Sequence, residues 1–341
     1  MTEDDKAALR EDLQANTDLD LAQIRVVEQI SQSDRTDYDL IGACVKMVIE
    51  RAKEQERGSK PSKDAGGALL IFCSGVGEIK QTIDAIKAQV RDNIDVLPLH
   101  ANLSPAEQRK VFEPQRASRR KVVVATNVAE TSITIPEVAY VIDTGKVKEQ
   151  RFEPQSGLSR LVECWASRAA CKQRRGRAGR TREGECFKIF SRRRESDMAA
   201  QQAPEIQRLP LDNLCLQIKA MRGDEDVRRF LSKAIDPPAS TAIDVALQHL
   251  VDSGALLMTN GTNGRLTPLG KHLVNGVNFS PCRPMLTIAS QSSLPLDLRL
   301  GKILVLGGVL GCISYALTIA AIMSGKPLFT SSFEDREKAS K

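Results

Sequence analysis

One decapeptide, CKQRRGRAGR at residues 171–180, concentrates cationic side chains among small residues. On a helix, residues three and four positions apart share a face, which would bring Gln173, Arg177 and Arg180 together. Gly176 and Gly179 would keep the opposite side thin. Two guanidinium groups beside an amide suit a nucleotide triphosphate, and arginine aimed at a transferring phosphoryl group accelerates that transfer. The alternative is a solvated basic helix face.

A second polar stretch, ATNVAETSITIP at 125–136, follows the apolar run KVVV. It supplies hydroxyl and amide groups from Thr126, Asn127, Thr131, Ser132 and Thr134. A loop of this kind after a buried strand can hold backbone phosphates of a nucleic acid without selecting bases. The alternative is a helix N-cap, in which Thr or Asn satisfies free backbone N–H groups.

The elements that must position these stretches alternate between strands and helices. Five apolar runs predict strands: ALLIFCSG, DVLPLHANL, RKVVVATN, VAYVIDTG and ECFKIFS. GEIKQTIDAIKAQV has helical spacing, and SPAEQRKVFE begins like a capped helix because Ser104 precedes Glu107 by three positions. The alternation predicts an α/β fold with a parallel sheet covered on both faces. Ligands of such sheets bind at the carboxyl ends of the strands, where we expect both polar stretches.

The chain divides by pattern into five parts. A polar, largely helical lead-in contains the amphipathic stretch DYDLIGACVKMVIERA, and after the sheet domain the strands give way to amphipathic helices. Asn-Gly turns there predict a β-hairpin, which with the helices indicates a small winged-helix domain. We expect a lead-in and linker at 1–65, the sheet domain at 66–200, the winged helix at 201–275, an atypical insertion at 276–293 and a helical segment at 294–341.

Composition is that of a soluble globular protein, with 41% hydrophobic and 27% charged residues. The net charge of +6 is compatible with nucleic acid. Eight cysteines without a CxxC pair predict neither a zinc site nor a disulfide framework, so we expect a reduced, intracellular protein. The charged N-terminus carries no signal-peptide pattern.

The uncharged segment Ile303–Met323 is long enough to span a bilayer. It has no aromatic belt. We therefore predict two short buried helices, broken near Gly311–Ser314, with Gly307 and Gly308 permitting close backbone approach.

Together these stretches resemble the DEAH-box (DEAH/RHA, DExH) branch of superfamily-two RNA helicases. The resemblance covers most of residues 35–336 and runs in order through LLIFCSGVGEI, PLHANLSPAEQRKVF, KVVVATNVAETSITIPEVAYVIDTG, QRRGRAGRTREGECFKIF, APEIQRLPLDNLCLQIKAM, FLSKAIDPP, LTPLGKHL and LPLDLRLGKILVLGGVLGCISYALTIAA. It implies that the sheet domain is the second RecA-like domain of the motor, followed by a winged helix and the start of a helical ratchet domain. The similarity to cytosolic members favours the cytoplasm over the nucleus.

The resemblance also implies site residues. It places Gln173, Arg177 and Arg180 at ATP phosphates, Ser132 as a sensor of nucleotide state, and Thr134 near the ribose. Many members carry an acidic residue where this chain has Pro136, which puts the ribose contact in doubt. The implied RNA-binding residues are Thr126, Asn127, Ser74, Gly75 and His100. VKEQRFEPQSGLSRLVECW matches the β-hairpin that separates strands during unwinding.

The sequence lacks two motifs that an ATP-hydrolysing helicase needs. It contains neither a GxxxxGK[ST] loop nor a DExH motif. The resemblance assigns both, and with them the Mg²⁺ that accompanies ATP, to a first RecA-like domain joined in the parent protein. Without these groups nucleotide cannot be held or in-line attack organised, so we expect the chain alone to be inactive and to hold no metal.

The insertion NGVNFSPCRPMLTIASQSS separates two segments that are contiguous in the family. It is either a surface loop, which costs little free energy, or an intron translated in frame.

Three functions remain open from the sequence. The first is the C-terminal portion of an ATP-dependent RNA helicase, which couples ATP hydrolysis to RNA translocation and unwinding. The second is a non-catalytic RNA-binding or partner-binding module with the helicase fold. The third, a single-span membrane protein, rests on Ile303–Met323 alone.

Overall fold

A computed structural model describes residues 33–57, 67–91, 93–114, 119–131, 134–153, 158–180, 183–223, 225–259, 263–275 and 298–324, with isolated positions between 7 and 27. The chain forms two compact units. The first unit combines Met1–Glu149 with Val162–Gln202, and the second combines Gln150–Leu161 with Ala203–Lys341.

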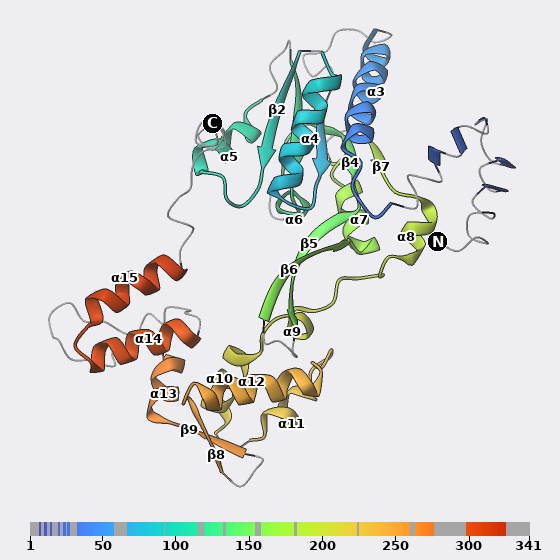
Figure 1. The fold of residues 1–341 in the computed structure, drawn as a ribbon. Coiled ribbons are helices and arrows are strands. Elements are labelled where there is room, and N and C mark those ends of the chain that lie inside the picture. The colour runs from blue at the N-terminus through green and yellow to red at the C-terminus, as the bar shows by residue number, and fades with distance from the viewer. Residues whose placement is uncertain are drawn as a thin grey trace. The chain divides into compact units, whose positions relative to one another are not determined.

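The first unit is built on a five-stranded sheet in which every neighbouring pair is parallel (Figure 1). The strand order is β2-β3-β1-β4-β7. All five strands were predicted, and the α/β fold with a parallel sheet is confirmed. Their bounds are β1 Ala68–Phe72, β2 Ile94–Leu99, β3 Arg120–Ala125, β4 Val138–Asp143 and β7 Glu185–Lys188.

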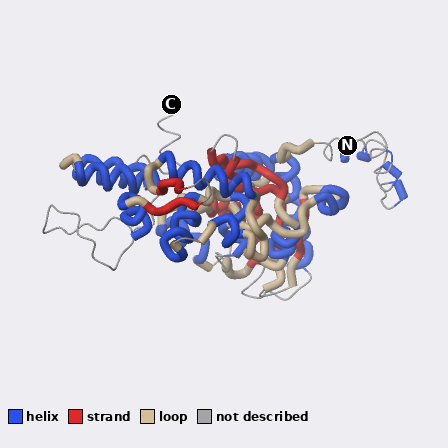
Figure 2. The backbone as a smooth tube through the Cα atoms, turned by 90° about the horizontal axis from the view of Figure 1, so that it is seen from below, coloured by secondary structure: helices blue, strands red, loops and turns tan. Residues whose placement is uncertain are grey.

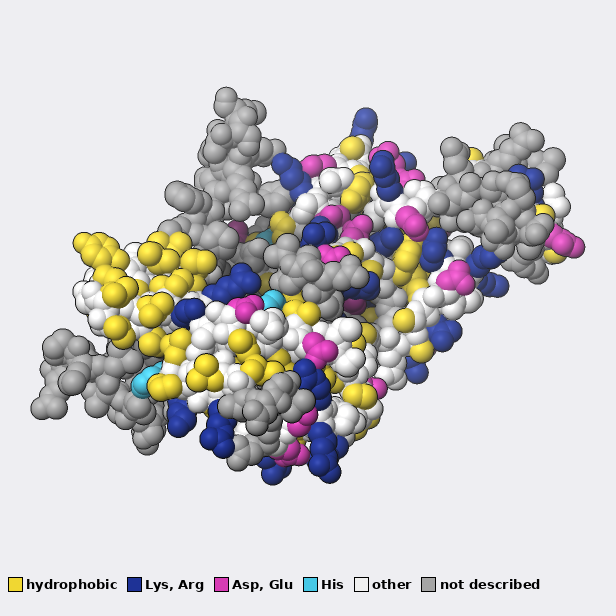
Figure 3. Space-filling view, turned by 60° about the horizontal axis from the view of Figure 1, so that its bottom comes forward, with side chains coloured by type: hydrophobic (Ala, Val, Ile, Leu, Met, Phe, Trp, Pro, Cys, Tyr) yellow, Lys and Arg dark blue, Asp and Glu magenta, His cyan; other side chains and the backbone are white. Residues whose placement is uncertain are grey.

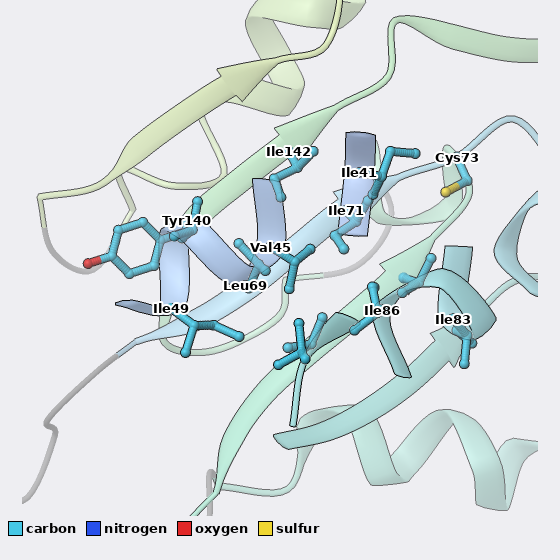
Figure 4. Packing of buried hydrophobic residues seen from close by; sticks show 14 of the residues in the cluster. Ile41, Val45, Ile49, Leu69, Ile71, Cys73, Ile83, Ile86, Tyr140 and Ile142 are labelled. Atoms are coloured by element: carbon cyan, nitrogen blue, oxygen red, sulfur yellow. The ribbon is translucent and has the colours of Figure 1, made fainter. Parts of the chain in front are cut away.

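One face of this sheet packs against α3 (Tyr38–Arg57) and α4 (Val76–Gln89). Alternate strand residues such as Leu69 and Ile71 point toward these helices, because successive side chains of a strand lie on opposite faces. Figure 4 shows the isoleucines of both helices pointing at strand side chains, and Ile41 and Ile86 are fully buried. The amphipathic stretch predicted before the sheet is α3, and it forms part of the sheet's core.

The opposite face is covered by α5 (Pro105–Phe112), α6 (Val128–Thr131) and α7 (Arg168–Arg175). Val111, Ala129 and Ala178 meet the other half of the strand residues here. The predicted start of α5 is confirmed as a capping box, in which the Ser104 hydroxyl accepts from the Glu107 backbone N–H and the Glu107 carboxylate accepts from the Ser104 backbone N–H. The sheet is therefore covered on both faces.

A two-stranded hairpin of β5 (Lys146–Glu153) and β6 (Leu158–Trp165) follows the fourth strand. This is the hairpin that the sequence predicted. Two short helices come after the sheet, α8 (Arg192–Asp197) and α9 (Glu205–Arg208).

The second unit is mainly helical. Figure 2 colours the helices of the whole chain blue and the strands red. The core of the second unit joins α10 (Asp212–Arg222), α11 (Val227–Leu231) and α12 (Ser240–Asp252). An antiparallel pair of strands, β8 (Leu256–Thr259) and β9 (Asn263–Leu266), follows α12 and confirms the predicted hairpin. Helix α13 (Pro268–Asn275) completes the winged-helix pattern.

The uncharged C-terminal segment forms two helices, α14 (Leu298–Val309) and α15 (Ile313–Ser324). The predicted break is confirmed at Gly311, whose φ of +73° favours glycine. Gly307 allows the close approach, since a Cβ there would lie 2.5 Å from the Cβ of Ala316. Among the described residues no helix has the length and apolarity to cross a bilayer.

The prediction that both helices are buried is wrong for α15. Only Ala316 and Ala320 of that helix are buried, because one face of α15 alone packs in the cluster that includes Leu304 and Val305 of α14. The exposed hydrophobic residues of α15 include Tyr315, Ile319, Ile322 and Met323. Figure 3 shows exposed hydrophobic side chains in yellow.

The five predicted domain ranges stay predictions. Helix α3 precedes the predicted boundary at residue 65 yet belongs to the first compact unit. The insertion at 276–293 lies outside the described residues.

Candidate nucleotide and nucleic-acid site

Helix α7 brings the arginine-rich stretch to the sheet. Ser167 caps its first turn by accepting from the Ala170 backbone N–H. The helix ends at Arg175, and residues 176–180 continue as turns. The prediction of one helical face running from Gln173 to Arg180 is therefore wrong. The turn arises because Arg177 and Ala178 donate to carbonyls three residues back, in place of the four-residue pattern of an α-helix.

Gly184 permits this turn to lie directly on the sheet. A Cβ at Gly184 would fall 2.1 Å from the carbonyl oxygen of Ala178 and 2.4 Å from that of Ala139. No side chain other than hydrogen fits between these two backbones. By contrast, a Cβ at Gly179 would meet nothing within 4 Å, so that glycine is not needed to keep the stretch thin.

Arg174 is the most buried cation of the stretch, with 1% of its surface exposed. Its Nη1 donates to Asp143 Oδ1 at 2.8 Å and to the Lys146 carbonyl at 3.3 Å, and its Nε donates to Glu130 Oε2 at 3.1 Å. The two carboxylates raise the pKa of Arg174 against the opposing effect of burial. Arg174 thus holds α7 to the end of β4, to the first residue of β5 and to α6.

Arg177 meets α6, and Arg180 meets the segment between α6 and β4. Arg177 is 5% exposed, and its Nη2 donates to the carbonyl oxygen of Glu130. Arg180 is exposed, and its Nη1 donates to Thr134 Oγ1 at 2.8 Å. Burial and then the positive charge of Arg180 lower the pKa of Arg177. Two guanidinium charges that disfavour each other would both be stabilised by an anion placed between them.

These residues lie over a face of the sheet. Arg177, Arg180 and Thr134 border a cavity of about 10 Å³ together with Leu70 and Val138. Leu70 is the middle residue of β1, and its side chain lies on the face covered by α6 and α7. The expectation that the arginine-rich stretch lies at the carboxyl ends of the strands is therefore wrong for Arg177 and Arg180, whereas Arg174 does reach the end of β4. The cavity has room for about one water molecule, so it is too small to enclose a nucleotide.

A different group of predicted residues does lie at the carboxyl edge. Ser74 follows β1, His100 follows β2, and Thr126 and Asn127 follow β3. Because these strands are parallel neighbours in the order β2-β3-β1, their ends meet at one edge of the sheet. The structure thus gathers residues predicted to bind RNA from three separate parts of the sequence.

Two neighbouring residues at this edge, Thr126 and Asn127, differ in how exposed their side chains are. Thr126 is 9% exposed, and its backbone N–H donates to the Leu99 carbonyl at 3.1 Å. Asn127 is exposed, and its carbonyl accepts from the backbone N–H of Glu130 at 2.9 Å. The Asn127 side chain is therefore the more accessible of the two.

Ser74 and Gly75 form the turn that opens α4. The Ser74 hydroxyl donates to Glu163 Oε1. A Cβ at Gly75 would lie 2.7 Å from Glu78 Oε2 and 2.9 Å from Lys148 Nζ, which form an ion pair beside it. Any side chain at this position would have to displace that pair.

His100 is 7% exposed, and its Nδ1 accepts from the Asn102 backbone N–H at 3.3 Å. Its Nε2 is buried and has no hydrogen-bond partner among the residues that the structure describes. Burial lowers the pKa of His100, against the opposing charge of Glu107. A neutral imidazole with one unsatisfied nitrogen is the state that this environment favours.

The remaining predicted residues are placed as follows. Gln173 is exposed on the last turn of α7. Pro136 precedes Glu137, which has a φ of +65°. Ser132 lies outside the described residues.

Sequence reasoning missed Asp143 and Glu130, the partners of Arg174. Asp143 is fully buried, and its Oδ1 also accepts from the Gly145 backbone N–H at 2.8 Å. The signal that could have found it is a carboxylate followed by Thr-Gly at the end of an apolar strand, since a buried charge requires a partner.

Two families match this chain. Residues 49–182 match the family described as helicase conserved C-terminal domain, and residues 297–341 match the ratchet-like helicase associated domain. A putative DEAH-box ATP-dependent helicase of Mycosarcoma maydis is 55% identical over 337 residues, which are 98% of this chain and 20% of that protein. This chain belongs to the DEAH-box helicases.

Other DEAH-box relatives agree over most of the chain. A chloroplastic DExH-box ATP-dependent RNA helicase of Arabidopsis thaliana is 40% identical over 293 residues, which are 84% of this chain and 18% of that protein. The crystal structure of the Escherichia coli DExH-box NTPase HrpB superposes with a TM-score of 0.66 at 28% identity. It covers 88% of this chain and 32% of the HrpB chain.

The chain spans about one fifth of the length of these curated DEAH-box relatives. The helicase match at 49–182 contains both predicted motifs, TNVAETS and QRRGRAGR. It begins inside α3, which agrees with the packing of that helix on the sheet.

Proposed function

We propose that this chain is the C-terminal portion of an ATP-dependent RNA helicase. In this proposal it couples ATP hydrolysis to movement along RNA only when joined to a first RecA-like domain. One observation carries the proposal: Arg177, Arg180 and Thr134 border one small cavity, while the residues at the edge formed by β2, β3 and β1 form a second, separate polar group. The same domain thus offers two separate places, one for a nucleotide and one for a nucleic acid.

Arg177 and Arg180 would hold the nucleotide phosphates, with Gln173 beside them and Thr134 toward the sugar. The donor set fits an anion, since Arg180 donates to a neutral hydroxyl and makes no ion pair with a carboxylate of the described residues. Hydrolysis of bound ATP supplies the free energy. The chain's own arginines would stabilise charge that develops on the transferred phosphoryl group. The Mg²⁺ ligands are assigned to the absent domain.

The RNA backbone would be contacted by Asn127, Ser74, Gly75 and His100. Thr126 would support the segment after β3 from inside the domain. These groups are small hydroxyls, an amide and backbone N–H groups, which contact phosphate and sugar without selecting bases. The chain contains only 4% aromatic residues, so base stacking contributes little. Weak sequence preference is therefore expected.

The test compares the parent protein with the 341-residue chain. The parent is expected to hydrolyse ATP and to unwind an RNA duplex that has a 3′ single strand, while the chain alone does neither. If the isolated chain hydrolysed ATP as fast as the parent, the proposal that hydrolysis requires the first RecA-like domain would be wrong. RNA binding by a parent that never hydrolyses ATP would favour a non-catalytic binding module.

A further inference from the structure

A pocket in the first unit takes no part in the proposed nucleotide and RNA sites. It has a volume of about 280 Å³ and lies beside the carboxyl ends of β4 and β7. Part of its lining comes from the segment before α3 and from the start of that helix. The rest consists of Thr144, Lys146, Trp165, residues 188–191 and Arg194. None of these residues belongs to the phosphate-facing or RNA-facing groups.

The centre of this pocket is a buried ammonium group. Lys146 is 6% exposed, and its Nζ lies 3.6 Å from the centroid of the Trp165 ring. The ammonium forms no hydrogen bond or ion pair with any residue that the structure describes, although the Lys146 backbone carbonyl accepts from Arg174. The cation–π contact stabilises the charge in part. A buried charge without a direct counterion is unfavourable, and burial lowers the pKa of Lys146 accordingly.

The nearest acidic groups are already engaged by other partners. Asp34 forms an ion pair with Arg194 at 3.0 Å, and Glu163 accepts from Ser74. Lys188, which also lines the pocket, is paired with Glu195. The pocket therefore has one interior positive charge whose counterion is not supplied by these carboxylates.

The walls around this charge are largely apolar. Trp165 and Phe190 meet edge to face with their ring centroids 6.3 Å apart, and Leu40 and Ile189 continue the wall. Arg35, Asp37 and Arg194 also line the pocket. Arg194 is paired with Asp34, and the Asp37 carboxylate accepts from the Leu40 backbone N–H at 3.0 Å. A single ammonium can neutralise one negative charge, whereas a phosphate dianion needs several converging donors. The walls favour a ligand whose remaining atoms are apolar.

We propose that this pocket binds a small organic monocarboxylate with an aromatic or branched apolar body. The carboxylate pairs with the Lys146 ammonium, and the apolar body packs on Trp165 and Phe190. The volume lies near the lower end of ordinary ligand pockets, which limits the ligand to about the size of a single ring with a short side chain. This assignment does not depend on the proposed helicase function.

Trp165 makes the test direct, because it is the single tryptophan of the 341 residues. The chain is titrated with phenylacetate at pH 7 while the tryptophan emission is recorded. We expect a saturable change in emission for phenylacetate. The isosteric neutral amide, phenylacetamide, is expected to bind at least tenfold more weakly, because it lacks the charge that pairs with the ammonium. Inorganic phosphate is expected to produce no saturable change.

Variants at two lysines of β5 complete the test. K146M should raise the dissociation constant for phenylacetate at least tenfold. K148M, whose side chain pairs with Glu78 and does not line the pocket, should leave it unchanged. The absence of saturable binding to the unmodified chain, equal affinity for the amide, or binding of phosphate with equal affinity would each overturn the proposal. The comparison of acid with amide needs no variant, so it stands even if K146M does not fold.

Discussion

Arg174 and Asp143 form a buried ion pair, with Nη1 and Oδ1 2.8 Å apart and side-chain exposures of 1% and 0%. Arg174 also reaches Glu130 of α6 and lies over the Phe72 ring, 5.1 Å from its centroid. One side chain of α7 therefore contacts α6, β1, the end of β4 and the start of β5. The loop that carries Asn127 and the turn that carries Arg177 and Arg180 share this support.

Removing this cation should destabilise the chain strongly. R174M leaves the Asp143 carboxylate buried without its partner, and breaking a buried pair in this way costs about 3–5 kcal/mol. Denaturation of the chain by urea measures the loss. R175A, at the exposed neighbour in the same helix turn, should change the free energy of unfolding by less than about 0.5 kcal/mol. Equal losses for both variants would show that the pair does not stabilise the fold.

The two glycines around the arginine turn should respond differently to alanine. G184A places a Cβ against two backbone carbonyls and should destabilise the chain by about 1–3 kcal/mol, as overpacking does. G179A has open space around the new methyl group and should stay within about 0.5 kcal/mol of the unmodified chain. Thermal or urea unfolding of both variants provides the comparison. A tolerated G184A would contradict the close contact between the turn and the sheet.

Arg180 should matter for ATP hydrolysis and not for folding. In the parent protein R180Q removes a guanidinium group from the proposed phosphate surface, and we expect hydrolysis to fall roughly a thousandfold. R175Q serves as the control, because it removes the same charge from the same stretch at an exposed position. Unfolding of R180Q in the 341-residue chain should match the unmodified chain. Undiminished hydrolysis by R180Q would remove Arg180 from the nucleotide site.

Asn127 should support RNA binding without selecting sequence. N127A is expected to weaken binding of the chain to several single-stranded RNAs by a similar factor, because a backbone contact carries no base information. Fluorescence anisotropy with poly(U)-like, poly(A)-like and mixed oligonucleotides measures this. Q81A, at an exposed amide on α4, is the matched control and should bind normally. A loss confined to one RNA sequence would speak against a backbone contact.

His100 should make the folded chain sensitive to mild acid. Burial lowers its pKa below the value of about 6.5 in the unfolded chain, so the unfolded chain takes up the proton first. Stability from the neutral ring is present above that value and is lost as the pH falls through the folded-state pKa, by at most about 1.4 kcal/mol per pH unit. Urea unfolding between pH 8 and pH 5 should show a smaller loss for H100N than for the unmodified chain. Parallel pH dependences would contradict the neutral, buried imidazole.

The order and type of the sheet elements followed from the sequence, because local patterns encode them. Apolar runs after turn residues predicted all five strands, and the spacing of Ser104 and Glu107 predicted the capping box that begins α5. The helical break at Gly311 also followed from composition, since glycine adopts its positive φ without strain. These features depend on neighbours within a few positions along the chain.

The arrangement of the site was decided by tertiary contacts. Helical spacing wrongly extended α7 to Arg180, because the sequence does not reveal that Gly184 lets the turn settle on the sheet. Arg174 and Arg177 are the same residue type, yet one is neutralised by two carboxylates from distant segments and the other donates to a backbone carbonyl beside a small cavity. The sequence by itself determined the fold class, the family motifs and their order. Only the packed structure decided which cation is held by carboxylates and which meets a backbone carbonyl, because burial and partners come from residues far apart in the chain.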